Sequence, residues 1–208
     1  INVDAAGIRP GSKEGRRILF VGRNFVRKGG PLVVQAFTIL RQKYLWSAEL
    51  YLAGAKESDI RDALRERQIR VEEVDWQKIH LLGDLGSEKL TDYYNLCDVF
   101  CMPSYFEAYG LVFAEALTYG LPCIGRDKFA MSEFIEDGCT GRLISGEDAE
   151  ELALDLWEVL QDPKYREEVE RRREWYLREY SWDKVAQRIC SVMEKNERDK
   201  DQYRSAGV

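Results

Sequence analysis

The sequence of 208 residues predicts an α/β fold in which helices cover both faces of a single parallel sheet. Two observations carry this prediction. Short, wholly apolar segments alternate with amphipathic helical segments, and strands without a polar face are typical of a sheet buried on both sides. The first three apolar segments also end in glycine, at Gly22, Gly54 and Gly83. This layout is Rossmann-like, and its ligands bind at the carboxyl ends of the strands.

The expected elements follow one another in strict alternation. Periodicity of the apolar residues separates strands from helices. We expect Ser87 to cap its helix at the amino end, and Gly120 to end a helix as the residue after its C-cap. The expected strands are Arg17–Gly22, Glu49–Gly54, Lys78–Gly83, Val99–Met102, Leu121–Gly125 and Gly141–Ile144. The helices between them are Pro31–Lys43, Ser58–Gln68, Ser87–Leu96 and Leu111–Tyr119.

Both ends of the chain read differently from its centre. Residues 1–15 contain glycine and proline and lack periodicity, which predicts an extended linker before a domain at 16–180. Residues 181–208 are expected to form a final helix and a frayed polar tail, Asn196–Val208. The three expected carboxy-terminal helices are Asp148–Gln161, Pro163–Tyr180 and Ser181–Lys195, the last capped by Ser181.

Composition excludes several classes of protein. Lys and Arg total 31 against 37 Asp and Glu, so the net charge of −6 argues against nucleic acid as a partner. No apolar run is long enough to cross a membrane, and no signal peptide is visible at Ile1. The five cysteines are irregularly spaced, which favours reduced thiols and a cytoplasmic location, with Cys101 and Cys123 buried. His80 is the only histidine, so neither a zinc site nor a histidine-dependent triad is expected.

Cations and glycines follow the first expected strand. Arg23 and Lys28 lie between Gly22 and the start of a helix, whose amino end carries unpaired N–H groups and a positive dipole. Arginine binds a phosphate through two hydrogen bonds and lysine adds a point charge. The segment therefore predicts a polyanion site, with a solvated basic turn as the alternative.

Two carboxylates accompany the fourth expected strand. Glu107 lies in the loop after it, and Glu115 lies within the next helix, which is otherwise apolar. A lone carboxylate on a largely buried helix needs a partner. Carboxylates also suit neighbouring hydroxyl groups, since each oxygen accepts a charge-assisted hydrogen bond. A pyrophosphate at this helix terminus would have one carboxylate on each side, suited to a sugar and to a ribose.

Five segments in order resemble the GT4 (group 1) family of retaining GT-B glycosyltransferases. Glu107 and Glu115 match its E-x7-E signature. The other segments are GRNFVRKGG, DYYNLCDVFCMPS, EFIEDGCTGRL and SWDKVAQRI, and together they run from about Arg17 to Ile189. The resemblance implies that the chain is the carboxy-terminal, donor-binding domain of a GT-B fold, which binds a nucleotide-diphosphate sugar, UDP- or GDP-linked.

The resemblance also implies roles for particular residues. Arg23 and Lys28, beside Gly22, would bind the pyrophosphate and act with Glu107 in catalysis. Glu107 would bind hydroxyls of the donor sugar, and Glu115 those of the ribose. Backbone groups would hold the rest of the donor: Ala108, Tyr109, Gly110 and Leu111 the sugar and phosphate, and Leu82, Gly83 and Leu85 the base. Neither a metal nor another cofactor is implied.

The resemblance has one departure and one gap. Where the family has a glycine-glycine-x-proline-glutamate turn, this chain keeps Glu133 but has Phe129-Ala130-Met131-Ser132. An amino-terminal domain that holds the acceptor would precede Ile1, because Asn2-Val3-Asp4…Pro10 resembles an interdomain linker. Any association of the full enzyme with a membrane would occur through that domain. The final helix would then pack on that domain, and this fragment alone would be inactive. The alternatives are a related epimerase or phosphorylase, or a non-catalytic nucleotide-sugar-binding module.

Overall fold

A computed structural model of the chain describes residue 3 and residues 5–9 and 14–205, with side chains up to residue 193. The expected linker motif at Asn2, Asp4 and Pro10 therefore lies outside the described residues, as do residues 206–208. Within the linker, Ala5–Gly7 forms a short 3₁₀ helix (η1), where the sequence predicts only extended chain. The side-chain amide of Asn95 donates a hydrogen bond to the Gly7 carbonyl at 2.8 Å and so holds η1 against α3 (Ser87–Leu96).

The described residues contain one six-stranded parallel sheet, which confirms the predicted fold class. Its order is β3-β2-β1-β4-β5-β6, so the chain reverses direction across the sheet between β1 and β4. The fifth strand begins two residues later than expected, because the Leu121 amide instead completes the end of the preceding helix by bonding Ala116 O. The strands are β1 Arg17–Val21, β2 Glu49–Ala53, β3 Ile79–Gly83, β4 Val99–Cys101, β5 Cys123–Arg126 and β6 Gly141–Ile144.

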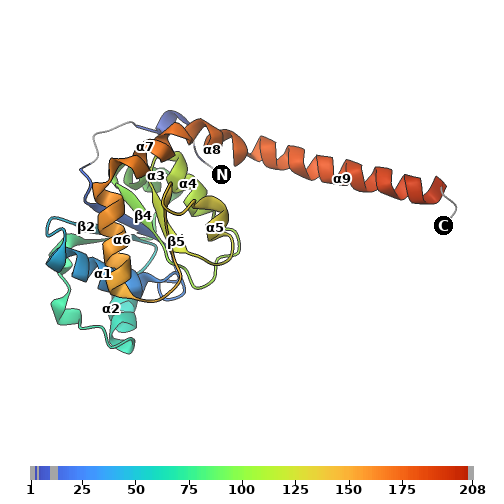
Figure 1. Cartoon of the computed structure of the whole chain (residues 1–208). Helices are drawn as coiled ribbons and strands as arrows, with labels where there is room; N and C mark the ends of the chain where they lie inside the picture. The colour runs from blue at the N-terminus through green and yellow to red at the C-terminus, as the bar shows by residue number, and fades with distance from the viewer. Residues whose placement is uncertain (1–2, 4, 10–13, 206–208) are drawn as a thin grey trace.

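Helices cover both faces of this sheet (Figure 1). On one face α6 packs across α1, and α2 lies beside α1. On the other, α4 packs against α7 and α8. The helices are α1 Gly30–Lys43, α2 Glu57–Glu66, α3 Ser87–Leu96, α4 Leu111–Thr118, α5 Met131–Phe134, α6 Ala149–Gln161, α7 Pro163–Arg171, α8 Arg173–Glu179 and α9 Trp182–Ser205. Two 3₁₀ turns, η2 Val71–Glu73 and η3 Trp76–Lys78, precede β3.

Three expectations about helices are wrong. Ser87 is the first residue of α3, and Gly86 is its N-cap without a side-chain hydrogen bond. The expected helix Pro163–Tyr180 is divided at Arg172, whose guanidinium is tied to Glu168 in α7 and Glu136 in a separate loop. The expected frayed tail instead continues α9 to Ser205, since no glycine or proline interrupts it.

Other local expectations are confirmed. The Ser181 hydroxyl accepts a hydrogen bond from the Lys184 amide at 3.1 Å and so caps α9. Gly120 takes the left-handed conformation (φ 82°) that ends α4. Cys101 and Cys123 are fully buried, and no disulfide joins any of the cysteines, all of which lie in the described part of the chain. None of the described helices has the length and apolar character needed to cross a membrane.

Gly29 lets the start of α1 approach the end of β4. It is the N-cap of α1 with φ 80°, and a Cβ on it would lie 2.4 Å from the Pro103 carbonyl oxygen. Such a distance is far inside van der Waals contact. The glycine therefore permits the two loops that follow β1 and β4 to touch.

We expect Gly29→Ala to lower the free energy of unfolding by about 2–3 kcal/mol, from left-handed backbone strain together with this clash. Gly138→Ala is the matched control, because Gly138 has φ 73° but a Cβ on it would meet nothing within 4 Å. It should cost only about 1 kcal/mol. Urea denaturation of both variants measures the difference, and equal losses would show that the close approach to Pro103 has no energetic weight.

Candidate functional site

The loops after β1 and β4 lie side by side at the carboxyl edge of the sheet. The carbonyl oxygen of Arg27 accepts hydrogen bonds from the Tyr105 amide at 2.9 Å and the Ser104 hydroxyl at 3.2 Å. In return the Arg27 guanidinium donates to the Phe106 carbonyl at 2.6 Å. Arg27 therefore joins the two loops, and its guanidinium is engaged in this contact.

Lys28 and Glu107 meet at the centre of this edge. Their side chains form an ion pair between residues 79 positions apart, with most of each side chain shielded from water. Gly22 makes room for the lysine stem, since a Cβ on Gly22 would lie 2.8 Å from Lys28 Cγ. The sequence placed both residues at this edge but did not predict that they would pair.

Arg23 extends toward the end of β3 instead. Its Nε and Nη2 donate to the two carboxylate oxygens of Asp84, each at 3.1 Å. Both side chains are well exposed, 82% for Arg23 and 65% for Asp84. An exposed pair of this kind contributes only about 0–1 kcal/mol, so an anion can replace the aspartate readily.

A small cavity lies beneath this pair. It measures about 130 Å³, and its lining includes Gly22, Arg23, Gly54 and Leu85. Close packing of glycines shapes it: the Gly54 amide donates to Gly83 O at 2.6 Å, and a Cβ on Gly54 would lie 2.8 Å from the carbonyl carbon of Gly22. Leu82, Gly83 and Leu85 are the residues expected to hold the base, and of these Leu85 lines the cavity. Leu82 packs against the core instead.

Glu115 finds the partner that its apolar helix required. The Tyr94 hydroxyl, from α3, donates to Glu115 Oε2 at 3.2 Å. Burial raises the pKa of Glu115, while this hydrogen bond opposes the shift by stabilising the carboxylate. The sequence does not identify Tyr94 as this partner, because the contact depends on how α3 packs beside α4.

The amino end of α4 is open. Gly110 is its N-cap with φ 79°, and no side chain caps it. Ala108, Tyr109 and Leu111 around it are exposed. The first N–H groups of a helix lack partners within the helix, so this terminus suits an anion or a hydroxyl oxygen. Gly110 also lies close to Glu107, because a Cβ on it would be 3.0 Å from Glu107 Cγ.

A polar cluster supports the loop that carries Glu107. The Tyr105 hydroxyl accepts a hydrogen bond from Arg67 Nη1 at 2.9 Å and donates one to Glu147 Oε2 at 2.8 Å. The buried Arg126 guanidinium lies 4.6 Å from the Tyr105 ring centroid and donates to Gly146 O at 2.7 Å. These residues were missed from the sequence, and the available signal was an arginine directly after an apolar strand.

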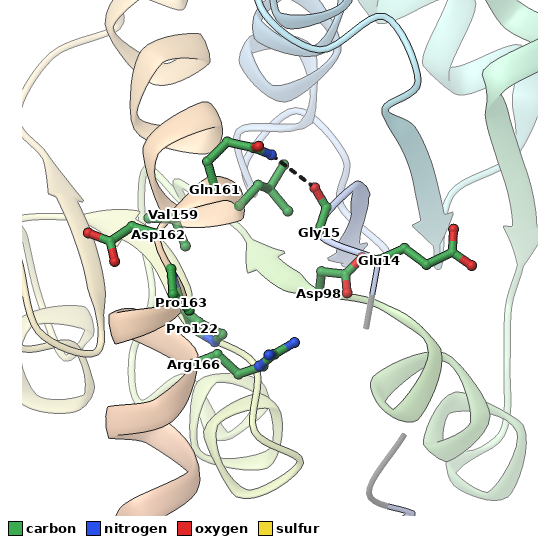
Figure 2. Close-up of a pocket in the computed structure, with 10 residues that line it drawn as sticks. Glu14, Gly15, Asp98, Pro122, Val159, Gln161, Asp162, Pro163 and Arg166 are labelled. Atoms are coloured by element: carbon green, nitrogen blue, oxygen red, sulfur yellow. Dashed lines mark hydrogen bonds between the residues drawn. The ribbon is translucent and has the colours of Figure 1, made fainter. Parts of the chain in front are cut away.

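A larger pocket lies at the opposite edge of the sheet (Figure 2). It measures about 280 Å³ and adjoins the amino ends of β1 and β4. Its lining contains the carboxylates Glu14, Asp98 and Asp162 against one cation, Arg166, and the Gln161 side chain donates to Gly15 O at 3.4 Å across it. The carboxyl end of α6 and the amino end of α7 meet here, so their partial charges oppose each other and the side chains set the sign of the pocket. An anionic ligand is therefore disfavoured here.

The structure thus brings the sequence-predicted residues to one edge in two groups. Lys28, Glu107 and Gly110 lie together, and Arg23 lies with Gly22 and Leu85. Glu115 is held by α3 within the helix that starts at this edge. Among the described residues, no group of three or more His, Cys, Asp or Glu side chains is placed to hold a metal ion.

A family model described as "Glycosyl transferases group 1" matches residues 9–175. An uncharacterized glycosyltransferase of Methanocaldococcus jannaschii is 28% identical over 180 residues, covering 85% of this chain and 44% of that protein. The phosphatidyl-myo-inositol mannosyltransferase of Mycolicibacterium smegmatis is 28% identical over 184 residues, covering 88% and 46%. The chain therefore spans less than half the length of these relatives.

Solved structures show the same fold. The sucrose-phosphate synthase of Thermosynechococcus elongatus has a TM-score of 0.74 at 26% identity, over 89% of this chain and 46% of that one. The pneumococcal O-GlcNAc transferase GtfA, solved with UDP and GlcNAc, has a TM-score of 0.68 at 23% identity, over 87% and 36%. The parallel sheet with helices on both faces matches the carboxy-terminal domains of GT-B glycosyltransferases.

We expect Tyr94→Phe to raise the pKa of Glu115 further, because the carboxylate loses its hydrogen bond while remaining half-buried. Carbon-detected NMR titration of the glutamate side chains measures this. Tyr119→Phe is the control: Tyr119 stacks on Tyr94 at 5.2 Å, but its hydroxyl contacts Thr91. If both variants change the pKa of Glu115 by the same amount, packing rather than the hydrogen bond determines that pKa.

Proposed function

This chain belongs to the group 1 glycosyl transferases, and we propose that it is the donor-binding domain of a retaining, metal-independent enzyme of the GT4 type. The ligand would be a nucleotide-diphosphate sugar, with UDP or GDP as the nucleotide. The observation that supports this most is the pair of cations at the carboxyl edge, Arg23 and Lys28, each held by one carboxylate.

Binding of the diphosphate would proceed by exchange of ion pairs. Arg23 would leave Asp84, to which it is joined only at the exposed surface, and form two hydrogen bonds with a phosphate. Lys28 would face the same diphosphate from the sugar side while Glu107 turns to the sugar hydroxyls. Lys28 is largely shielded from water, so its positive charge would act through a lower dielectric and attract the diphosphate more strongly.

The remaining groups would hold the other parts of the donor. Glu115, kept in place by Tyr94, would accept hydrogen bonds from the ribose hydroxyls. The backbone of Leu82 and Gly83, together with Leu85, would border the base. N–H groups at the start of α4, from Ala108 to Leu111, would bind the sugar and phosphate. No cofactor is required in this proposal.

The same groups would assist departure of the nucleotide. Negative charge grows on the diphosphate as its bond to the donor sugar breaks, and Arg23, Lys28 and the amino end of α4 would stabilise that charge. The acceptor would be held by an amino-terminal domain of the same protein, through which any association with membranes would occur. We further propose a reducing, cytoplasmic setting, because five irregularly spaced cysteines suit thiols better than disulfides.

We expect calorimetry to detect binding of UDP or GDP, and Arg23→Ala to weaken it by about tenfold, since a charge-assisted hydrogen bond is lost. Asp84→Asn should instead strengthen binding by about threefold, because the arginine is no longer neutralised. Arg166→Ala, at the opposite edge, is the matched control and should have no effect. Failure of UDP, GDP and ADP species alike to bind the unaltered chain would exclude the proposed function.

The final helix supplies a second test of the proposal. Figure 1 shows α9 extending away from the rest of the chain. Its apolar side chains Trp182, Ile189, Val192 and Met193 are more than half exposed. In a protein that carries both domains, we expect the amides of residues 182–193 to exchange with solvent more slowly than in this chain, because α9 would pack on the other domain. Equal exchange in the two proteins would refute that packing.

A further inference from the structure

Phe106 and Phe129 form an exposed aromatic pair at the candidate site. Their ring centroids lie 5.1 Å apart with an angle of 69° between the planes. The side chains are 52% and 51% exposed, unusual for two phenylalanines in contact. Phe106 directly precedes Glu107, and Phe129 follows β5, the strand next to β4. The ring pair therefore belongs to the loops after β4 and β5, and one of its members is the neighbour in the chain of Glu107, to which the proposed function assigns the sugar hydroxyls.

The backbone of Phe129 is strained. Its φ is 57°, in the left-handed region that favours glycine, and Gln68 is the only other non-glycine residue with positive φ in the described part of the chain. Gln68 lies just past the end of α2, a common place for this conformation. For Phe129, which follows a strand rather than a helix, this conformation carries an energetic cost. A glycine would avoid that cost but would leave no ring at this position.

We propose that Phe106 and Phe129 form a specificity-determining wall, against which the C–H face of a neutral hexose of the donor packs. This inference rests on the proposed function. A pyranose ring has an apolar C–H face and a polar edge of hydroxyls. The two exposed phenyl rings offer the matching apolar surface, and Glu107, which follows Phe106 in the chain, offers the hydrogen-bond acceptor.

The same wall disfavours an acidic sugar. A uronic acid would place its carboxylate among apolar rings, where desolvation is costly, and near the negative charge of Glu107. In the proposed complex the Lys28 ammonium faces the diphosphate, so it compensates little for a second carboxylate. The donor selected by the wall is therefore a neutral hexose, such as a glucose- or mannose-type sugar, rather than a uronic acid.

The test compares donors with their bare nucleotides on this 208-residue chain. Calorimetry gives the dissociation constants of UDP, UDP-glucose and UDP-glucuronic acid, with GDP and GDP-mannose as a second pair. The measured quantity is the ratio of the affinity for the hexose donor to that for its bare nucleotide. The variants are Phe129→Gly, which suits the left-handed backbone, and Phe106→Ala. Trp46→Ala is the control. Trp46 is exposed and lies just before the amino end of β2, at the opposite edge of the sheet.

We expect both phenylalanine variants to lower this ratio by about fivefold while affinity for the bare nucleotide stays within about twofold. Phe129→Gly should also lower the ratio of the affinity for UDP-glucose to that for UDP-glucuronic acid. Phe129→Leu keeps an apolar side chain and should lower this ratio less. If the bare nucleotide binds and the ratio is unchanged in both variants, the wall does not contact the donor sugar and the inference is overturned. A chain that binds neither nucleotide instead overturns the proposed function, and the wall with it.

Discussion

Pairing of β1 with β4 is the constraint on which the candidate site depends. Ile18 pairs with Val99 and Leu19 with Phe100, so two strands about 80 residues apart in sequence end side by side. Their following loops must then touch, and Gly29 allows this contact because any side chain there would meet Pro103. The hydrogen bonds of Arg27 and the Lys28–Glu107 pair follow from this proximity. At such a reversal of strand order, no helix crosses the carboxyl edge between the two strands, which leaves it open to a ligand.

Charge is arranged so that an acidic chain keeps one edge suited to an anion. The net charge is −6, and the opposite edge of the sheet gathers Glu14, Asp98 and Asp162 around one pocket. At the carboxyl edge each cation is matched by a carboxylate, but the two pairs differ in exposure. The Arg23–Asp84 pair lies in water and is weakly held, whereas the Lys28–Glu107 pair is shielded. In the proposed complex, a diphosphate would bind Arg23 after breaking only the weak pair with Asp84, while Lys28 would stay in position.

Exposed apolar side chains underlie two of the proposals. The phenyl rings of Phe106 and Phe129 lie in the loops after β4 and β5. The helix α9, whose apolar side chains are exposed, extends away from the rest of the chain (Figure 1). The strained backbone of Phe129 distinguishes its ring from an incidental exposed residue, since the fold maintains it against a local energetic cost.

The sequence by itself determined the alternation of strands and helices, the open carboxyl edge and the residues gathered there. These depend on local periodicity, glycine positions and residue spacing, which short segments encode. Tertiary structure alone decided which side chains meet. Arg23 pairs with Asp84 from 61 positions away, and Tyr94 of α3 bonds Glu115 of α4. It also divided the helix at Arg172 and set the left-handed backbone at Phe129. Such contacts depend on how separate elements pack in three dimensions, which the local pattern of a single sequence does not specify.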